Sequence, residues 1–367
     1  MTPKVAIVII NWNGYAHTRA CLESLSRITY PCCEIIVVDN ASTDGSREKL
    51  QAEFPQQRFI VNPSNLGFAR GCNVGIRKAL SGDAAYVLLL NNDTVVKEGF
   101  LEPAVALAES DPKIGLVTGK IYAYGRPGHI WYAGGTVSLL RGRGRVRGCG
   151  CRDTGQFDRV CEVGYGEGAL MLIKRSVLDA IGLLPEEYFF GTEVYDYSIC
   201  ARRRGYKVFY VPEFCICHES GSPARALAPK YLYNGHRSKL IFQQKFLPTW
   251  LFRPWELAFL IYSLWVTTRR LERLDRAGSE AFLAALEWAF LDHHDNAGKC
   301  VTEKDLETFE SRLQRPGSTA SGDRAGRVGR RGRRLGVLIR VAVHMLIARR
   351  RGGAAKKPSA VSWEAGS

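Results

Sequence analysis

The stretch VAIVIINWN, from Val5 to Asn13, places a continuous apolar run rich in β-branched residues directly before a polar turn. A run of six apolar residues is too short for a buried helix, so it predicts a buried strand at Val5–Ile10. Similar short apolar runs recur at Glu34–Val38, Arg58–Val61 and Tyr86–Leu90. These runs predict four strands of one sheet.

Segments with helical spacing separate these strands, at Ala16–Ser26, Ser46–Phe54 and Phe68–Leu80. Strands that alternate with helices favour right-handed crossovers between parallel neighbours. The predicted fold class is therefore α/β, with a mostly parallel central sheet and helices on both faces.

The stretch Ile121–Cys161 is rich in Gly and Arg and has weak periodicity, which predicts a long excursion or flap rather than core. After it the sequence predicts an apolar run at Ala169–Ile173, helices at Ser176–Ile181 and Tyr195–Arg204, and a strand at Tyr206–Val211.

Polar side chains follow the predicted strands where each strand ends. Asn11 follows the first strand, Asp39 ends the second, and Asn91 and Asp93 follow the fourth. The carboxyl ends of parallel strands meet at one edge of the sheet, where open α/β folds bind ligands. A carboxylate there can hold Mg²⁺ or Mn²⁺, which bridges diphosphate oxygens. An Asx turn that ends the strand would give the same pattern around Asp93.

Asp39 begins the run DNASTDGS, which also has two interpretations. Asp39 can accept a hydrogen bond from a base or a ribose at the sheet edge. Alternatively, the Ser, Thr and Asp residues of the run cap the helix that follows.

Four motifs occur in order along the chain. They are VAIVIINWN at 5–13, IIVVDNASTDGS at 35–46, NLGFARGCNVG at 65–75 and LLLNND at 88–93. In this order and spacing they resemble the family 2 glycosyltransferases, in particular the rhamnosyltransferase-like branch. The resemblance covers residues 1–240 and extends to GEGALM at 166–171 and CHESGS at 217–222.

The resemblance implies a GT-A fold, inversion at the anomeric carbon, a nucleoside-diphosphate sugar donor and a divalent cation, Mg²⁺ or Mn²⁺. It implies that Asp39 contacts the base and that Asp93 is the main metal ligand. His218 would complete the metal shell, although a lone His is more often structural. The remaining predicted nucleotide-sugar-binding residues are Asn11, Asn65, Arg70, Asn73, Asn91 and Asn92.

The predicted catalytic residues are Glu193 and Asp196, in the stretch FFGTEVYD at 189–196. Inverting transfer needs a carboxylate that takes the proton of the acceptor hydroxyl. The resemblance implies that the position of Val194 normally supplies it, and a valine cannot accept a proton. Glu193 is adjacent and is the first candidate for the base. Alternatively, Glu193 caps the helix and Asp196 pairs with Arg202 or Arg203.

The predicted function is transfer of a sugar such as rhamnose to a glycan or polyprenyl-linked acceptor in cell-surface glycan synthesis. Because of Val194, the alternative is a non-catalytic protein that binds a nucleotide sugar or a glycan on the same fold.

The formal charge of +15 is concentrated at the C-terminus. From Arg312 onward there are 14 Lys and Arg against Asp323 and Glu364, so the preceding body is nearly neutral. A basic tail beside apolar segments favours contact with an anionic membrane surface, and no RNA-binding aromatic motif supports nucleic-acid binding. The apolar run Trp250–Thr268 is interrupted by Arg253, Pro254 and Glu256, so we expect an interfacial helix and no membrane span.

The predicted organisation has four parts. They are a catalytic domain at 1–240, a helical membrane-associating or acceptor region at 241–314, an Arg/Gly-rich linker at 315–334 and an amphipathic basic tail at 335–367. The composition, with 46% hydrophobic and 24% charged residues, excludes a wholly disordered chain and a polytopic membrane protein.

The chain has eleven cysteines, no Cys-x-x-Cys motif and no signal-peptide pattern at its start. These features predict reduced thiols and a cytoplasmic protein, peripheral on the inner face of the membrane. A zinc site that includes Cys217 and His218 is the alternative for the cysteines.

Overall fold

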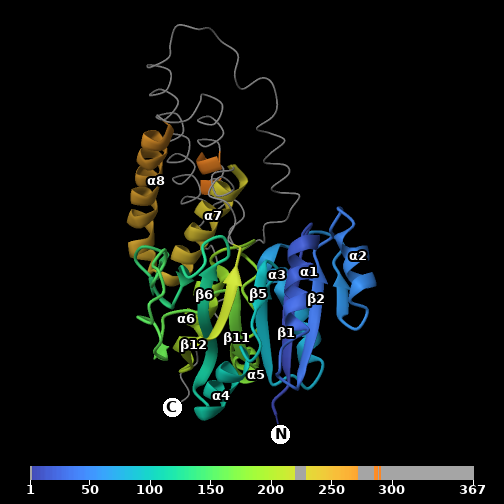
Figure 1. Ribbon diagram of the computed structural model, residues 1–367. Helices are drawn as coiled ribbons and strands as arrows, with labels where there is room; N and C mark the ends of the chain where they lie inside the picture. Colours follow the sequence, from blue (N-terminus) through green and yellow to red (C-terminus); the bar gives the residue numbers. More distant parts are fainter. Residues whose placement is uncertain (1, 220–228, 272–284, 288, 291–367) are drawn as a thin grey trace. The chain divides into compact units, whose positions relative to one another are not determined.

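The four N-terminal apolar runs form strands in the computed structural model (Figure 1), which describes residues 2–219, 229–271, 285–287 and 289–290. The strands are β1 (Val5–Asn11), β2 (Cys33–Asp39), β3 (Arg58–Val61) and β4 (Tyr86–Asn91). Helices α1 (Tyr15–Leu25), α2 (Ser46–Glu53) and α3 (Gly67–Leu80) connect them. The predicted α/β class is confirmed.

The elements after β4 complete the fold. They are β5 (Thr94–Val96), α4 (Glu102–Ser110), β6 (Ile114–Ala123), β7 (Ile130–Tyr132), β8 (Gly135–Ser138), β9 (Arg143–Val146), β10 (Cys161–Glu162), β11 (Leu170–Lys174), α5 (Arg175–Ile181), α6 (Glu193–Arg203), β12 (Lys207–His218), α7 (Pro229–Phe246) and α8 (Thr249–Leu271).

One ten-stranded sheet organises the first part of the chain. Its order is β10-β12-β6-β11-β4-β1-β2-β3, with β5 added beside β12 and β7 beside β6. Strands β3, β2, β1 and β4 are parallel, and so are β6 and β12. Strand β11 runs antiparallel to both of its neighbours, β4 and β6. The start of β11 therefore lies at the same edge as the carboxyl ends of β4 and β6.

Alternating side chains of β1 contribute to two cores, one on each face of the sheet. Val5, Ile7 and Ile9 pack in a cluster with side chains from α1, α2 and α4. Ala6 and Val8 pack in a second cluster with side chains from α3, α5 and α6. Because both faces are covered, the strands are apolar on both sides, which is why they read as continuous apolar runs.

The prediction of an excursion outside the core at Ile121–Cys161 is wrong in part. Strand β7 pairs with β6, and Ile130, Tyr132 and Ala133 are fully buried. The Gly and Arg residues that weaken the periodicity belong mainly to the β8–β9 hairpin and the loops around it.

Strand β12 bulges where it passes Gly119 of β6. The register shifts between Val211 and Cys215, so Pro212, Glu213 and Phe214 have no partner residue on β6. A Cβ atom on Gly119 would lie 1.5 Å from the carbonyl oxygen of Phe214. Only glycine lets the two backbones approach this closely.

The chain divides into two compact units, and the sheet and its helices belong to the first, with residues 2–138 and 143–219. The second unit holds residues 139–142 and the described residues from Pro229 onward. Its apolar cluster consists of Leu240, Leu260, Leu264, Leu286 and Phe290.

Helix α8 contains the predicted interfacial segment. Large apolar side chains remain exposed along it, at Trp250, Leu257, Ile261, Tyr262 and Trp265. Within the described residues, no helix combines the length and the apolar character that crossing a membrane requires. The predicted linker at 315–334 and the tail at 335–367 lie outside the described residues.

Candidate active site

The polar residues that end β1, β2 and β4 meet at one edge of the sheet. Asn11 is the register partner of Asp39, and Ile10 pairs with Asn91. On the other side of β4, Leu90 pairs with Leu170 at the start of β11. The edge therefore collects residues from both the parallel half and the mixed half of the sheet.

Asn11 and Asp39 form a buried hydrogen-bond network. The amide nitrogen of Asn11 donates to Oδ2 of Asp39 at 2.8 Å, and to the hydroxyls of Ser42 and Ser46 at 3.1 Å. Thr18 donates to the amide oxygen of Asn11 at 2.7 Å, and Ser42 donates to Asp39 through its backbone and its hydroxyl. Asp39 is 1% exposed, so the network fixes its carboxylate before any ligand arrives.

Two residues of this edge adopt the left-handed backbone region although they are not glycine. Asn13, after β1, has φ 50°, and Ala41, after β2, has φ 60°. For alanine this conformation costs about 1–2 kcal/mol. Hydrogen bonds hold the two loops together: Asn13 donates through its backbone to Ser42, and Thr43 donates to the Asn13 side chain.

The predicted pocket residues Asn65, Arg70 and Asn73 lie at or on α3. Asn73 is fully buried, donates to the Leu184 carbonyl and to Glu186, and accepts from the Leu184 amide. Asn65 accepts from the Gly67 amide at 2.9 Å and is 6% exposed. Arg70 is half-buried, and its Nε lies 3.7 Å from Glu186. Of the three, only Arg70 keeps a partly exposed side chain, while Asn73 positions the segment around Leu184.

The predicted metal ligands Asp93 and His218 lie side by side. Nε2 of His218 is 3.1 Å from Oδ1 of Asp93 and 3.2 Å from the amide nitrogen of Asn91. If Asn91 donates to Nε2, the lone pair of that nitrogen also faces the Asp93 oxygen. In that tautomer the buried Oδ1 of Asp93 has no hydrogen-bond donor among the described residues. Two acceptors facing each other favour a cation between them.

Asn92 links the turn after β4 to α1. Its amide nitrogen donates to the Thr18 hydroxyl at 2.9 Å, and so joins the network of Asn11. A Cβ atom on Gly14 would lie 2.7 Å from the same nitrogen. Asn92 therefore connects the Asp39 network with the turn that carries Asp93.

The predicted catalytic carboxylates begin helix α6, and both are buried. Glu193 is 4% exposed and accepts from the Thr192 amide at 2.9 Å. Burial raises its pKa, and the amides of Gly191, Thr192 and Glu193 oppose that shift. Asp196 is 1% exposed and accepts from the Tyr188 hydroxyl at 2.9 Å and from the Cys200 thiol.

These contacts bear on whether Glu193 and Asp196 act in catalysis or serve as a helix cap and an ion-pair partner of Arg202 or Arg203. The Glu193 carboxylate binds amides at the helix start, which is the capping arrangement. Arg202 lies 3.8 Å from Glu162, an exposed carboxylate of β10. Val194 is buried in the core cluster that also contains side chains of β1 and α3.

Glu167 is a carboxylate of this edge that sequence reasoning missed. It precedes β11, is half-buried, and its backbone amide lies 3.4 Å from the Thr118 hydroxyl. Burial raises the pKa of Glu167 to about 7; His218 lowers the pKa and Glu193 raises it further. The sequence feature that could have identified Glu167 is an acidic residue between two glycines, Gly166 and Gly168, shortly before an apolar strand.

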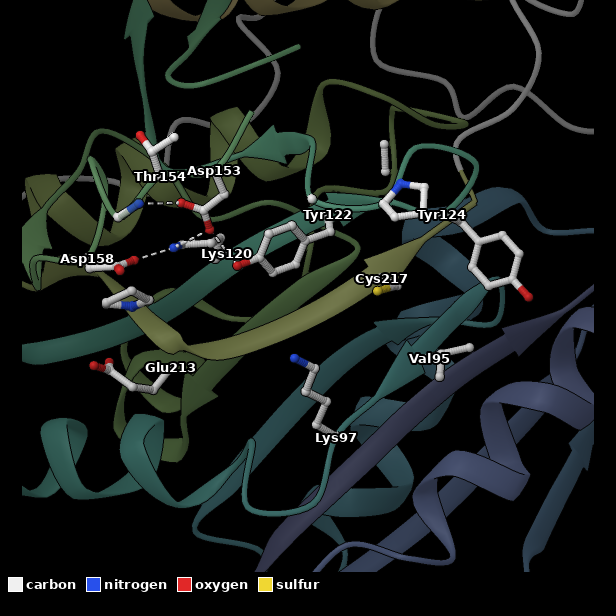
Figure 2. A pocket seen from close by; sticks show the side chains of 15 residues that line it. Val95, Lys97, Lys120, Tyr122, Tyr124, Asp153, Thr154, Asp158, Glu213 and Cys217 are labelled. Carbon is white, nitrogen blue, oxygen red and sulfur yellow. Dashed lines mark hydrogen bonds and ion pairs between the residues drawn. The ribbon is translucent and has the colours of Figure 1, made fainter. Parts of the chain in front are cut away.

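A separate pocket of about 820 Å³ opens on the side of β12 to which Cys217 points (Figure 2). His218, the next residue of the strand, faces the opposite side. Lys120 lies in the pocket wall and forms ion pairs with Asp153 and Asp158, and Tyr122 donates to Asp153. Burial lowers the pKa of Lys120, but these hydrogen bonds more than offset it and leave the pKa raised. The contacts tie the loop at 153–158 to β6.

Two relatives of known name match parts of the chain. It is 24% identical over 262 residues to N-acetylglucosaminyl-diphospho-decaprenol L-rhamnosyltransferase of Mycobacterium tuberculosis, covering 66% of this chain and 84% of that protein. It is 30% identical over 128 residues to glycosyltransferase GlyG of Streptococcus pneumoniae, covering 34% and 41% of the two chains.

A solved structure shares the fold. The crystal structure of GalNAc-T7 with UDP, GalNAc and Mn²⁺ aligns with a TM-score of 0.53 at 17% identity, over 80% of this chain and 58% of that one. The profile of glycosyl transferase family 2 matches residues 6–182, from β1 to the end of α5. Residues 6–182 therefore match a glycosyl transferase family 2 domain, the chain has the GT-A fold, and it is similar to a rhamnosyltransferase of Mycobacterium tuberculosis.

Proposed function

We propose that this protein transfers a sugar such as L-rhamnose from a nucleoside-diphosphate sugar to a lipid-linked or polysaccharide acceptor, with inversion. The observation that carries the proposal is the Asp93–His218 pair, whose facing oxygen and nitrogen lie beside the Asp39 network at the ligand edge. The similarity to a rhamnosyltransferase whose name contains a polyprenyl-linked acceptor supports the same acceptor class.

Asp93 and His218 fit a divalent cation. Mn²⁺ and Mg²⁺ at nucleotide sites commonly take one or two protein ligands and complete their shell with phosphates and water. This agrees with the described residues, in which no three His, Cys, Asp or Glu side chains cluster around one point. When bound, such an ion neutralises charge that develops on the departing diphosphate.

We assign donor binding, orientation of the metal ligands and proton acceptance to other side chains at this edge of the sheet. Asp39, held by Asn11 and Ser42, presents an oriented acceptor to the base or ribose of the donor. Arg70, at the start of α3, presents a cation toward donor phosphates. Asn91 and Asn92 orient His218 and the turn that carries Asp93. Among the described residues near this edge, Glu193 and Glu167 are candidates to take the acceptor proton. The third predicted carboxylate, Asp196, accepts from Tyr188 and Cys200 and is the weaker candidate.

A panel of donors tests the function. We expect one nucleotide sugar among dTDP-L-rhamnose, UDP-sugars and GDP-mannose to raise the melting temperature by about 5–10 °C at ~100 times Kd, only with Mn²⁺ or Mg²⁺. The same donor should release its nucleoside diphosphate when a prenyl-diphosphate-linked N-acetylglucosamine is added. Absence of both responses across the panel would refute the proposal.

A second candidate function is non-catalytic binding of a nucleotide sugar or glycan. Val194, which places an apolar side chain at the position of the expected base, favours it. The donor panel separates the two functions, because a binding protein would show the thermal shift without release of nucleoside diphosphate.

We also propose that the protein is cytoplasmic and contacts the inner membrane surface through α8 and the basic tail. Trp250, 76% exposed, and Trp265, 51% exposed, suit a bilayer interface, and the Lys and Arg residues after Arg312 suit anionic headgroups. Such contact would bring the enzyme to a polyprenyl-linked acceptor.

Removal of residues 315–367 tests this contact. We expect the truncated protein to bind phosphatidylglycerol vesicles more than about tenfold more weakly than the full chain in co-sedimentation, because each basic residue near the surface contributes about 1 kcal/mol. The donor-induced thermal shift should stay the same, which shows that the truncated protein is folded. Equal binding to anionic and to neutral phosphatidylcholine vesicles would contradict the proposal.

A further inference from the structure

The proposed reaction needs a carboxylate that is free to take a proton, and the two candidates at the edge differ in this respect. The Glu193 carboxylate accepts from the Thr192 amide, and the charged form is further stabilised by the amides of Gly191 and Glu193. These bonds use its lone pairs to hold the start of α6. A carboxylate committed in this way is a weaker proton acceptor.

Glu167 is less committed. Its carboxylate accepts from one amide, that of Gly168, and among the described residues it takes part in no ion pair. Its charged form is opposed by burial and by Glu193. The side chain therefore has acceptor capacity to offer to a ligand.

The position of Glu167 places it between the two halves of the site. The backbone amide of Asn91 donates to the Ala169 carbonyl, so the segment 167–169 runs beside the end of β4, just before the turn that carries Asp93. On its other side, a Cβ atom on Gly168 would lie 3.0 Å from a methyl carbon of Val194. Glu167 thus directly precedes the glycine that packs against Val194, the residue where the expected base is missing.

We propose, on the basis of the proposed function, that the Glu167 carboxylate is the general base of the transfer and that Glu193 is a positioning residue which holds the start of α6. The proton of the acceptor hydroxyl moves to Glu167. The hydroxyl oxygen forms the bond to the anomeric carbon, and the bond from that carbon to the diphosphate oxygen breaks, its electron pair leaving with the nucleoside diphosphate.

The surroundings of Glu167 suit this role. The titratable groups that interact electrostatically with Glu167 are Tyr132 and Tyr165 before it, Glu193 and Tyr195 on α6, and His218 on β12. Burial keeps the pKa of all three tyrosines above the ordinary value, so they stay neutral at pH 7. A carboxyl with a pKa of about 7 can both take and release a proton at that pH.

The test compares Glu167→Gln, Glu193→Gln and the control Glu162→Gln, which makes the same change at an exposed residue of β10. The donor that turns over in the panel is used for all assays. We expect Glu167→Gln to lower kcat by about 10²–10⁴-fold, while the donor KM and the donor-induced thermal shift stay within about twofold. Glu162→Gln should behave like the wild type.

Two further readouts separate a base from a structural residue. The wild-type kcat should fall as the pH drops below about 7, and the residual activity of Glu167→Gln should lack this limb. Formate, a small carboxylate, should restore activity to Glu167→Ala in a saturable manner, whereas chloride at equal ionic strength should not.

The outcomes are distinguishable. If Glu167→Gln keeps the wild-type kcat and pH profile while Glu193→Gln loses turnover, the assignment to Glu167 is overturned and the proposed function stands. If the wild type releases no nucleoside diphosphate from any donor, both fall together. Loss of kcat with rescue by formate supports the assignment.

Discussion

Asp93→Asn should lower kcat/KM for metal-dependent transfer by more than about 100-fold. The change keeps the shape of the side chain but removes the negative charge from the oxygen that faces Nε2 of His218 at 3.1 Å. Loss of groups that merely orient a ligand costs about 10–100-fold in metal affinity or activity, and loss of the ligand itself should cost more. Steady-state kinetics across a Mn²⁺ titration measures the effect.

Binding of the ion provides a readout that does not depend on turnover. Titration of Mn²⁺ with a nucleoside diphosphate, followed by electron paramagnetic resonance, should show a bound ion in the wild type and much weaker binding in Asp93→Asn. Asp179→Asn, the same substitution on the exposed side of α5, is the matched control. An unchanged Mn²⁺ titration in Asp93→Asn would rule out Asp93 as a metal ligand.

Gly119→Ala should prevent stable folding. Its Cβ atom would lie 1.5 Å from the carbonyl oxygen and 2.6 Å from the carbonyl carbon of Phe214, so a backbone would have to move. The bulge of β12 and the pairing of β6 with β12 depend on this approach. We expect a loss of more than about 4 kcal/mol of unfolding free energy, measured as a fall of roughly 8–16 °C in melting temperature or as insoluble protein.

Gly125→Ala is the control for this substitution. No atom lies within 4 Å of a Cβ built on Gly125, and its φ is not in the left-handed region. The melting temperature of this variant should stay close to that of the wild type, because surface substitutions usually change stability by less than about 0.5 kcal/mol. Equal stability of the two variants would show that β12 can move away from β6 at low cost.

The sequence predicts the parallel half of the sheet well, because its signals are local. The apolar runs of β1, β2 and β4 are buried on both faces, and polar residues end each of them. The antiparallel direction of β11 has no local signal, since Leu170–Lys174 is an apolar run in either direction. The bulge of β12 is set by contact with a strand about ninety residues earlier in the chain, and its sole local trace is Pro212.

In the candidate site, too, residues within local motifs were predicted, and residues whose role depends on distant contacts were not. Asp39, Asp93 and His218 were predicted as site residues from motifs, and the structure brings Asp93 and His218 together at the edge where Asp39 lies. Glu167 was missed because a single Glu carries no periodicity, and its significance comes from neighbours on β7, α6 and β12. The hydrogen bonds of Asn73 to the Leu184 segment span more than one hundred residues, so a pattern cannot distinguish that role from a ligand contact.

The antiparallel strand β11 has a consequence for how such a protein can acquire new specificity. It separates the block β3-β2-β1-β4, which carries Asn11 and Asp39, from the block β6-β12, which carries His218. Because β11 enters the sheet at the ligand edge, the loop before it, which carries Glu167, is not part of a strand that holds the donor. A chimera joined across the β4–β11 boundary would have to keep Glu167, and to keep His218 next to Asp93, in order to exchange its acceptor and retain its nucleotide.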